Sequence, residues 1–140
     1  MSAMPFLMKE EPTNYSYDAF AKDRGTTWTG VKNPLAQKHL RSLRKGDLVF
    51  YYHTGDEKQI VGIVKVIKEH YPDPTADGGP WVVVDVEAVE PFKRFVTLSE
   101  IKAEPKLKDM ILVKYSRLSV QPVKDAEWAQ IMKMGEMKTK

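Results

Sequence analysis

The segment RGTTWTGVKNPLAQKHLRSLRKGDLVFYYH, Arg24–His53, decides the fold, because it joins a well-marked helix to a strand. Asn33 and Pro34 form a strong helix start, since Asn caps a helix and Pro at the first helical position loses no needed donor. Gly46 suits the helix end. The strong β-formers of LVFYYH then predict a strand over 48–53, with aromatic rings on both of its faces.

The same segment holds the positive charge of the protein. From Arg24 to Lys45 it has six basic residues and no acidic one, and the 16 basic and 19 acidic residues elsewhere leave a net −3. Helical spacing puts Ala36, Leu40 and Leu43 on an apolar stripe. Lys38, Arg41 and Lys45 fall on another face. Cations beside aromatic rings are typical of nucleic-acid binding, but a solvated helix face explains the charge equally well.

Composition limits the class of protein. A chain of 140 residues with 42% apolar residues predicts a single domain over 1–140, with a core at about 5–135 and a frayed tail over 136–140. The absence of cysteine excludes disulfides, thiolate catalysis and cysteine-ligated zinc. No apolar run is long enough for a membrane span, and the start does not resemble a signal peptide. We therefore expect a cytoplasmic monomer.

The remaining pattern predicts an α+β fold. Gly62 predicts a bulge or a close approach by another group. The loop over 70–80 is expected to be irregular because it has three prolines and two glycines. Strands dominate without regular alternation with helices, which favours a small mixed barrel with peripheral helices. Strands are expected at 5–9, 26–31, 48–53, 59–67, 81–89, 92–96 and 118–122. Helices are expected after Ser16, Asn33, Thr97 (a capping box with Glu100) and Asp125, with a helical turn at 107–113.

Catalytic and metal sites have little support. His39, His53 and His70 lack metal-ligand spacing, so we expect no metal, and no motif for a nucleotide cofactor occurs. His53 ends a strand, and Asp47 and Asp73 are the candidates to orient it as an acid or base. No nucleophile accompanies it, so a hydrogen-bonded histidine in a pocket wall is favoured.

The tryptophans divide by context. Trp128 lies on an apolar helix face and is expected in the core. Trp28 instead stands in a polar segment directly before the basic helix, and Tyr71 and Trp81 flank the irregular loop. Rings held in such positions favour a pocket.

Six motifs in order resemble the EVE domain family, which includes the thymocyte nuclear proteins. The resemblance implies a PUA-like fold, a curved β-barrel of about five to six mostly antiparallel strands with short peripheral helices, related to the YTH readers of methylated RNA. The motifs are KEEP (9–12), WTGVKN (28–33), GD with FYYH (46–53), YPDPT (71–75), Trp81 with VDV (84–86), and RLSVQPV (117–123).

The resemblance also implies a pocket for a modified base in DNA or RNA. Its candidate residues are Lys9, Trp28, Gly30, Val31, Asn33, Tyr51, Tyr52, His53, Tyr71, Asp73 and Trp81. Lys32, Lys38 and Arg41 are candidates for contacts with flanking phosphates. An extruded base is held by stacking and by hydrogen bonds to its edge, and the Asn33 side chain carries both a donor and an acceptor.

Three functions follow from these residues. The first is a non-catalytic module, without a cofactor, that reads a modified base in nucleic acid. The second is an enzyme acting on a nucleotide or nucleic acid, with His53 as acid or base. The third is a pocket for a small metabolite, with the basic helix merely solvated.

Overall fold

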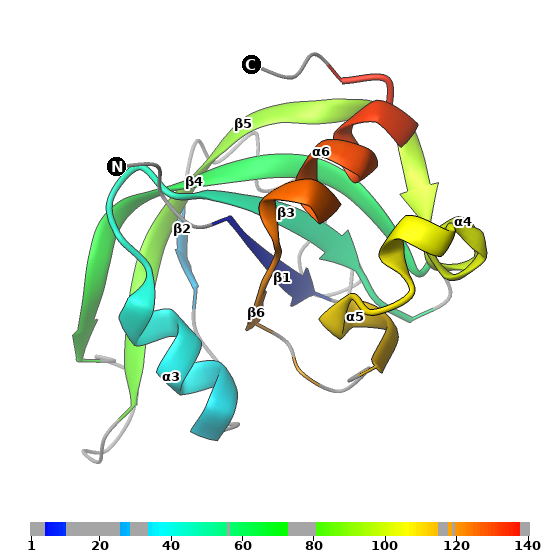
Figure 1. Cartoon of the computed structure of the whole chain (residues 1–140). Coiled ribbons are helices and arrows are strands. Elements are labelled where there is room, and N and C mark those ends of the chain that lie inside the picture. The colour runs from blue at the N-terminus through cyan, green and yellow to red at the C-terminus, as the bar shows by residue number, and fades with distance from the viewer. Residues whose placement is uncertain are drawn as a thin grey trace.

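The strands of the protein form one mixed, strongly curved sheet (Figure 1). The computed structural model describes residues 5–10, 26–28, 34–55, 57–72, 81–114, 118 and 120–137. Within these residues the sheet has six strands in the order β2-β5-β4-β3-β1-β6. They are β1 (Phe6–Glu10), β2 (Thr26–Trp28), β3 (Leu48–His53), β4 (Gln59–Pro72), β5 (Val82–Thr97) and β6 (Val120–Pro122).

The pairing of the strands is mostly antiparallel. Only β1 and β3 pair in parallel among the described strands. The described part of the sheet is not closed, since β2 and β6 are its two edges. This confirms the expected α+β class and the curvature of the sheet, whereas the predicted barrel is not closed by the described strands. The helix expected after Ser16 lies outside the described residues.

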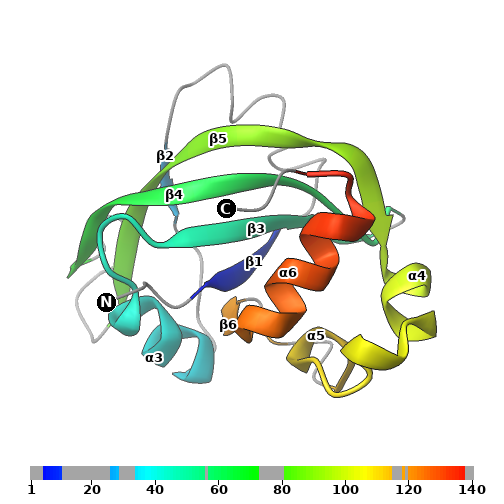
Figure 2. The same ribbon diagram turned by 45° about the horizontal axis from the view of Figure 1, so that its top comes forward.

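Short helices cover the two faces of the sheet (Figure 2). On one face, Leu40 of the basic helix and Leu43, which directly follows that helix, pack with Tyr51 of β3. On the other, Ile131 of α6 packs with Phe50 of β3. The helices are α3 (Pro34–Ser42), α4 (Leu98–Ala103), the 3-10 helix η1 (Pro105–Leu107), α5 (Ile111–Lys114) and α6 (Asp125–Met134). The predicted turn at 107–113 is thus two short pieces, and α6 has Lys124 rather than Asp125 as its N-cap.

Strand β4 is longer than the sequence predicts. The expectation of irregular structure from His70 is wrong up to Pro72, because Tyr71 pairs with Val83 and Pro72 with Val82. Proline lacks an N–H donor and is tolerated at a strand end. The rest of that predicted loop lies outside the described residues.

Strand β5 is likewise continuous where two strands were expected. It runs through Pro91, which stands opposite Gly62 of β4. Register shifts flank Gly62, between Tyr51 and Tyr52 on β3 and between Ile60 and Gly62 on β4, which confirms the predicted bulge. A bulge leaves local ladder bonds unmade, so a residue without an N–H fits opposite it.

The C-terminal residues are ordered further than expected. Met137 was predicted to lie in a frayed tail. It is instead buried against the cluster that holds α6, and its Sδ lies 3.4 Å from the backbone N of Lys93. An apolar contact made by the last described residue of the chain is a tertiary effect that local sequence does not signal.

The predicted capping box at Thr97 is confirmed. The Glu100 N–H donates to Thr97 Oγ1 over 3.2 Å, and the Thr97 N–H donates to Glu100 Oε1 over 3.1 Å. Thr97→Ala is expected to lower the free energy of unfolding by about 1 kcal/mol, because the Glu100 N–H loses its acceptor. Thermal unfolding measures this, with the exposed Ser99→Ala on the same helix as control. Equal losses in the two variants would contradict a capping role.

Candidate nucleic-acid interface

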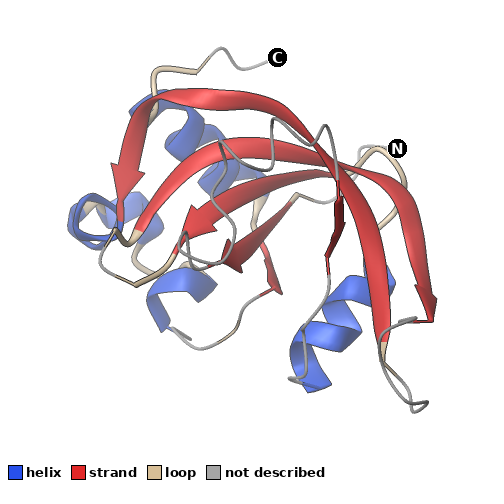
Figure 3. Ribbon diagram, turned by 180° about the vertical axis from the view of Figure 1, so that it is seen from behind, coloured by secondary structure: helices blue, strands red, loops and turns tan. Residues whose placement is uncertain are grey.

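The candidate residues that the structure describes fall into two groups near opposite ends of β4. Tyr52 lies beside Ile60 near the start of β4, and Lys9 is on the neighbouring β1. Tyr71 is near the end of β4, and Trp81 directly precedes the partner strand β5. Figure 3 shows that β4 and β5 arch, so that their two ends point to the same side of the molecule.

Lys9 and Tyr52 form a pair on adjacent parallel strands. They are register partners, and Lys9 Nζ lies 5.8 Å from the centroid of the Tyr52 ring. Burial lowers the pKa of Lys9 from 10.5 to about 8 and raises the pKa of Tyr52 to about 12. Both shifts follow from removing a charge from water. A partly buried cation beside an aromatic ring favours binding of an electron-rich group.

Tyr51 and His53 lie on the opposite face of β3 from Tyr52. Their rings meet edge to face with centroids 5.6 Å apart, and Tyr51 packs in the cluster beneath α3. Alternation along a strand makes this separation unavoidable. Tyr51 and Tyr52, both candidates for the pocket, therefore present their rings to different sides of the sheet.

His53 has a partner that the sequence did not single out. Its Nδ1 donates to Glu57 Oε1 over 2.8 Å, and its side chain is 8% exposed. This hydrogen bond holds the pKa of Glu57 below its usual value. Glu57 stands four residues after His53, across the turn that joins β3 to β4. The position of Glu57 in that short loop, close to His53 along the chain, could have identified it from the sequence as a partner of His53.

Asp47, which was considered as a partner for His53, has a structural role. Its Oδ2 accepts from the Arg44 N–H over 2.8 Å, and its backbone N–H donates to Arg44 O over 2.9 Å. These bonds close the turn between α3 and β3, where Gly46 has a φ of +95°. Burial raises the pKa of Asp47, partly offset by the hydrogen bond from Arg44. The other acid considered, Asp73, lies outside the described residues.

The Tyr71 ring is held by two polar neighbours. Its hydroxyl donates to Asp85 Oδ1 over 2.6 Å. Lys68 Nζ lies 4.3 Å from its centroid. A cation over the ring at this distance covers one of its faces. A ligand cannot stack on that face while the Lys68 cation lies over it.

The end of β5 near Trp81 connects to α3 and β2. Trp81 is half-buried, and the next residue, Val82, is hydrogen-bonded to the side chain of Gln37 on α3. The backbone of Trp28 pairs with Val84. Trp28 and Trp81 thus belong to adjoining parts of one sheet edge. The basic helix is attached to that same edge.

The basic candidates are partly described. Lys38 and Arg41 are exposed on α3, while Ala36, Leu40 and Leu43 are buried, which confirms the predicted division of the helix into an apolar and a basic face. Gly30, Val31, Lys32 and Asn33 lie outside the described residues.

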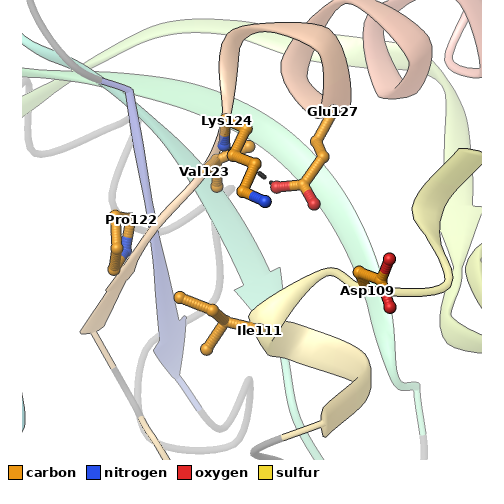
Figure 4. Close-up of a pocket in the computed structure, with 6 residues that line it drawn as sticks. All are labelled: Asp109, Ile111, Pro122, Val123, Lys124 and Glu127. Carbon is orange, nitrogen blue, oxygen red and sulfur yellow. Dashed lines mark hydrogen bonds between the residues drawn. The ribbon is translucent and has the colours of Figure 1, made fainter.

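A hollow of about 200 Å³ lies between α5, β6 and α6 (Figure 4). Ile111, Pro122 and Val123 give it an apolar floor, and the Glu127 carboxylate at its rim accepts from the Lys124 N–H over 3.0 Å. Pockets for drug-sized molecules are typically about 300–1,000 Å³, so this hollow is small for one. None of the candidate base-pocket residues lines it.

The described residues also bear on metal binding and on membrane insertion. Across the described ranges, no group of three His, Asp or Glu side chains is placed to hold a metal ion. The helices among these residues include none with the length and apolar character needed to cross a membrane.

Comparison with known proteins places the chain in a family. Thymocyte nuclear protein 1 of Gallus gallus is 37% identical over 136 residues, which are 81% of this chain, and the chain spans only 56% of that relative's length. A Rhodopseudomonas palustris protein solved by NMR has a TM-score of 0.91 at 49% identity, covering 95% of this chain and 93% of its own.

A crystal structure of the human THYN1 protein in complex with DNA containing 5-methylcytosine has a TM-score of 0.87. It is 30% identical and covers 98% of this chain and 100% of its own. The model of the EVE domain matches residues 5–134, nearly the whole chain. These agreements bear out the resemblance read from the six motifs, and with it the PUA-like α+β fold. The protein is a member of the EVE domain family.

Proposed function

We propose that this protein is a non-catalytic module that binds nucleic acid and reads a modified base, with DNA containing 5-methylcytosine as the first ligand to test. The observation that carries the proposal is the human relative bound to such DNA, whose fold matches 98% of this chain. A shared fold alone does not imply a shared function. The identity of 30% over that span, together with the basic helix beside Trp28 and Trp81, gives the analogy a physical basis.

The proposed roles follow from chemistry. Lys32, Lys38 and Arg41 neutralise backbone phosphates, because exposed cations bind them without reading sequence. Trp28 and Trp81 offer ring faces on which an extruded base stacks.

The polar candidates complete the pocket. Asn33 reads the base edge through its amide. The partly buried Lys9 donates a charged hydrogen bond that becomes strong away from water. Extrusion of a base costs a few kcal/mol, which these contacts offset.

The test is direct binding. Fluorescent single- and double-stranded oligonucleotides with cytosine, 5-methylcytosine, 5-hydroxymethylcytosine or N6-methyladenine are titrated with the full chain over a salt series, with RNA versions of the same sequences alongside. We expect one modified base to tighten binding at every salt concentration. Equal and steeply salt-dependent binding to all of them would refute base reading and leave a basic surface. Salt-independent binding of a small molecule would favour the metabolite pocket.

Trp28→Ala is expected to remove the preference for the modified base while leaving the fold intact. Loss of one base–aromatic stack costs about 1–3 kcal/mol of binding free energy. Circular dichroism and thermal unfolding check the fold, and titration with matched modified and unmodified oligonucleotides gives the preference. Lys133→Ala, an exposed change on the distant α6, is the control. Retained preference in a folded Trp28→Ala protein would exclude this ring from the pocket.

The enzymatic alternative concerns His53. The ring is nearly buried, bonded at Nδ1 to Glu57 and in edge contact with Tyr51, which suits a wall residue. A His53→Ala protein that binds as well as the unmodified chain but loses turnover on a nucleic-acid substrate would establish an enzyme. The cytoplasmic location and the monomeric state stay predictions.

A further inference from the structure

The side chain of Gln37 makes two hydrogen bonds to a single backbone residue. Gln37 Oε1 accepts from the Val82 N–H over 2.9 Å, and Gln37 Nε2 donates to Val82 O over 3.2 Å. Gln37 is 2% exposed, although it belongs to the basic helix α3. This residue therefore faces the sheet, unlike its exposed neighbour Lys38. A buried neutral amide is not a phosphate ligand.

The register of the sheet shows that the Gln37 amide stands in for a backbone partner of Val82. On β2, Thr26 pairs with Val86 and Trp28 with Val84. In an antiparallel ladder, alternate residues present both N–H and C=O to the same neighbouring strand. Val82 is the next residue in that alternation, and the described part of β2 ends at Trp28. The Gln37 amide therefore occupies the place that a further residue of β2 would take beside Val82.

Among glutamine, glutamate, arginine, lysine and methionine, only the carboxamide of glutamine performs this task. Both the donor and the acceptor of Val82 need a partner at the sheet edge, and a side chain must supply one of each. Glutamate lacks the donor when ionised, arginine and lysine lack an acceptor, and methionine lacks a donor and has only a weak acceptor. The geometry is thus specific to glutamine at this length and position.

The two hydrogen bonds between Gln37 and Val82, called the clamp below, are important because they join α3 to β5 beside several candidate residues. Segment 29–33, which contains the candidates Gly30, Val31, Lys32 and Asn33, runs between the end of β2 and the start of α3. Its first flank is held to β5 by the pairing of Trp28 with Val84. Its second flank is held to β5 by the bonds of Gln37 to Val82. Trp81, another candidate, directly precedes the residue that receives the clamp.

We propose that Gln37 is a positioning residue for base discrimination. By holding α3 to β5 two residues from the Trp28–Val84 pair, it sets the spacing between the two ends of segment 29–33 and Trp81. Binding sites need their supporting contacts to hold side chains within about half an ångström. The inference rests on the proposed reading of a modified base and assigns Gln37 a part in it that does not involve contact with the ligand.

The experiment compares three variants of the full chain. Gln37→Met keeps the length of the side chain and removes both strong hydrogen bonds, and Gln37→Glu keeps the shape and the acceptor and removes the donor. Lys38→Met is the matched control, an adjacent exposed change on the same helix. Each is titrated with 5-methylcytosine and cytosine oligonucleotides over a salt series. Thermal unfolding and hydrogen exchange at the Val82 amide are measured without ligand.

We expect Gln37→Met to reduce the preference for the modified base by about tenfold, with the salt dependence of binding unchanged. Gln37→Glu is expected to reduce the preference for the modified base by a smaller factor. This variant provides the test if Gln37→Met does not fold. The Val82 amide exchanges faster in Gln37→Met, since it has lost its acceptor. In contrast to Gln37→Met, the control Lys38→Met is expected to weaken binding to both oligonucleotides equally and to lower the salt dependence of binding.

Two results overturn the inference and are distinguishable. If the unsubstituted protein prefers the modified base and both folded Gln37 variants retain that preference, the positioning role is wrong and the proposed function stands. If the unsubstituted protein shows no preference for any modified base, the proposed function is wrong. The positioning role is then also wrong, because it rests on that function. Faster Val82 exchange would then identify a purely structural clamp.

Discussion

Phe50→Ala is expected to lower the free energy of unfolding by about 3–5 kcal/mol, the usual range for deleting a buried aromatic ring. Phe50 is 0% exposed. Its ring stacks on Trp128 of α6 with centroids 3.7 Å apart and meets Phe92 of β5 edge to face at 5.5 Å. The substitution leaves a cavity where α6 rests on the sheet and removes both ring contacts. Urea unfolding followed by tryptophan fluorescence and circular dichroism measures the loss.

Phe95→Ala is the matched control for this prediction. Phe95 is on β5 but is 46% exposed, so its removal is expected to cost less than about 1 kcal/mol. Phe50→Leu gives a smaller cavity and an intermediate value if Phe50→Ala does not fold. Similar losses for Phe50→Ala and Phe95→Ala would show that the contact between α6 and the sheet does not depend on this ring.

Lys9→Met is expected to stabilise the fold and to weaken nucleic-acid binding. Burial alone lowers the pKa of Lys9 to about 8, so at neutral pH the fold carries a cation partly removed from water. Replacing it with an apolar side chain of similar length removes that penalty. Because much of the side chain still reaches solvent, the gain is about 1 kcal/mol. Affinity for the preferred oligonucleotide falls about tenfold, the effect of one lost hydrogen bond to a charged group.

The pH dependence provides a separate check on Lys9. Between pH 8 and 10.5 the unfolded chain holds a proton on Lys9 that the folded chain has released, so stability rises with pH in that window. The Lys9→Met variant lacks this part of the rise. Lys102→Met, an exposed change on α4, is the control and is expected to leave both stability and binding nearly unchanged. A destabilised Lys9→Met protein with full binding would contradict a functional reason for this buried cation.

Local signals in the sequence determined the helices and the bulge. Pro34 begins α3, and Thr97 with Glu100 forms the predicted box. The helix ends at Ser42, earlier than predicted, and Gly46 instead has its positive φ in the turn before β3. Gly62 marks the bulge. Each of these depends on the backbone preferences of a few adjacent residues, so the sequence alone suffices. The six ordered motifs likewise identified the family, because their order and spacing are properties of the chain itself.

The tertiary structure alone decided contacts between residues distant in the chain. The length of β4 depends on pairing with β5, which overrode the prolines near its end. The desolvation of Lys9 depends on what surrounds β1, and the bonds of Gln37 depend on where β2 stops. The sequence marks Gln37 only as a polar residue on a basic helix. Its role beside Val82 arises because strand register and burial are set by the whole sheet, whereas sequence patterns report only on neighbours along the chain.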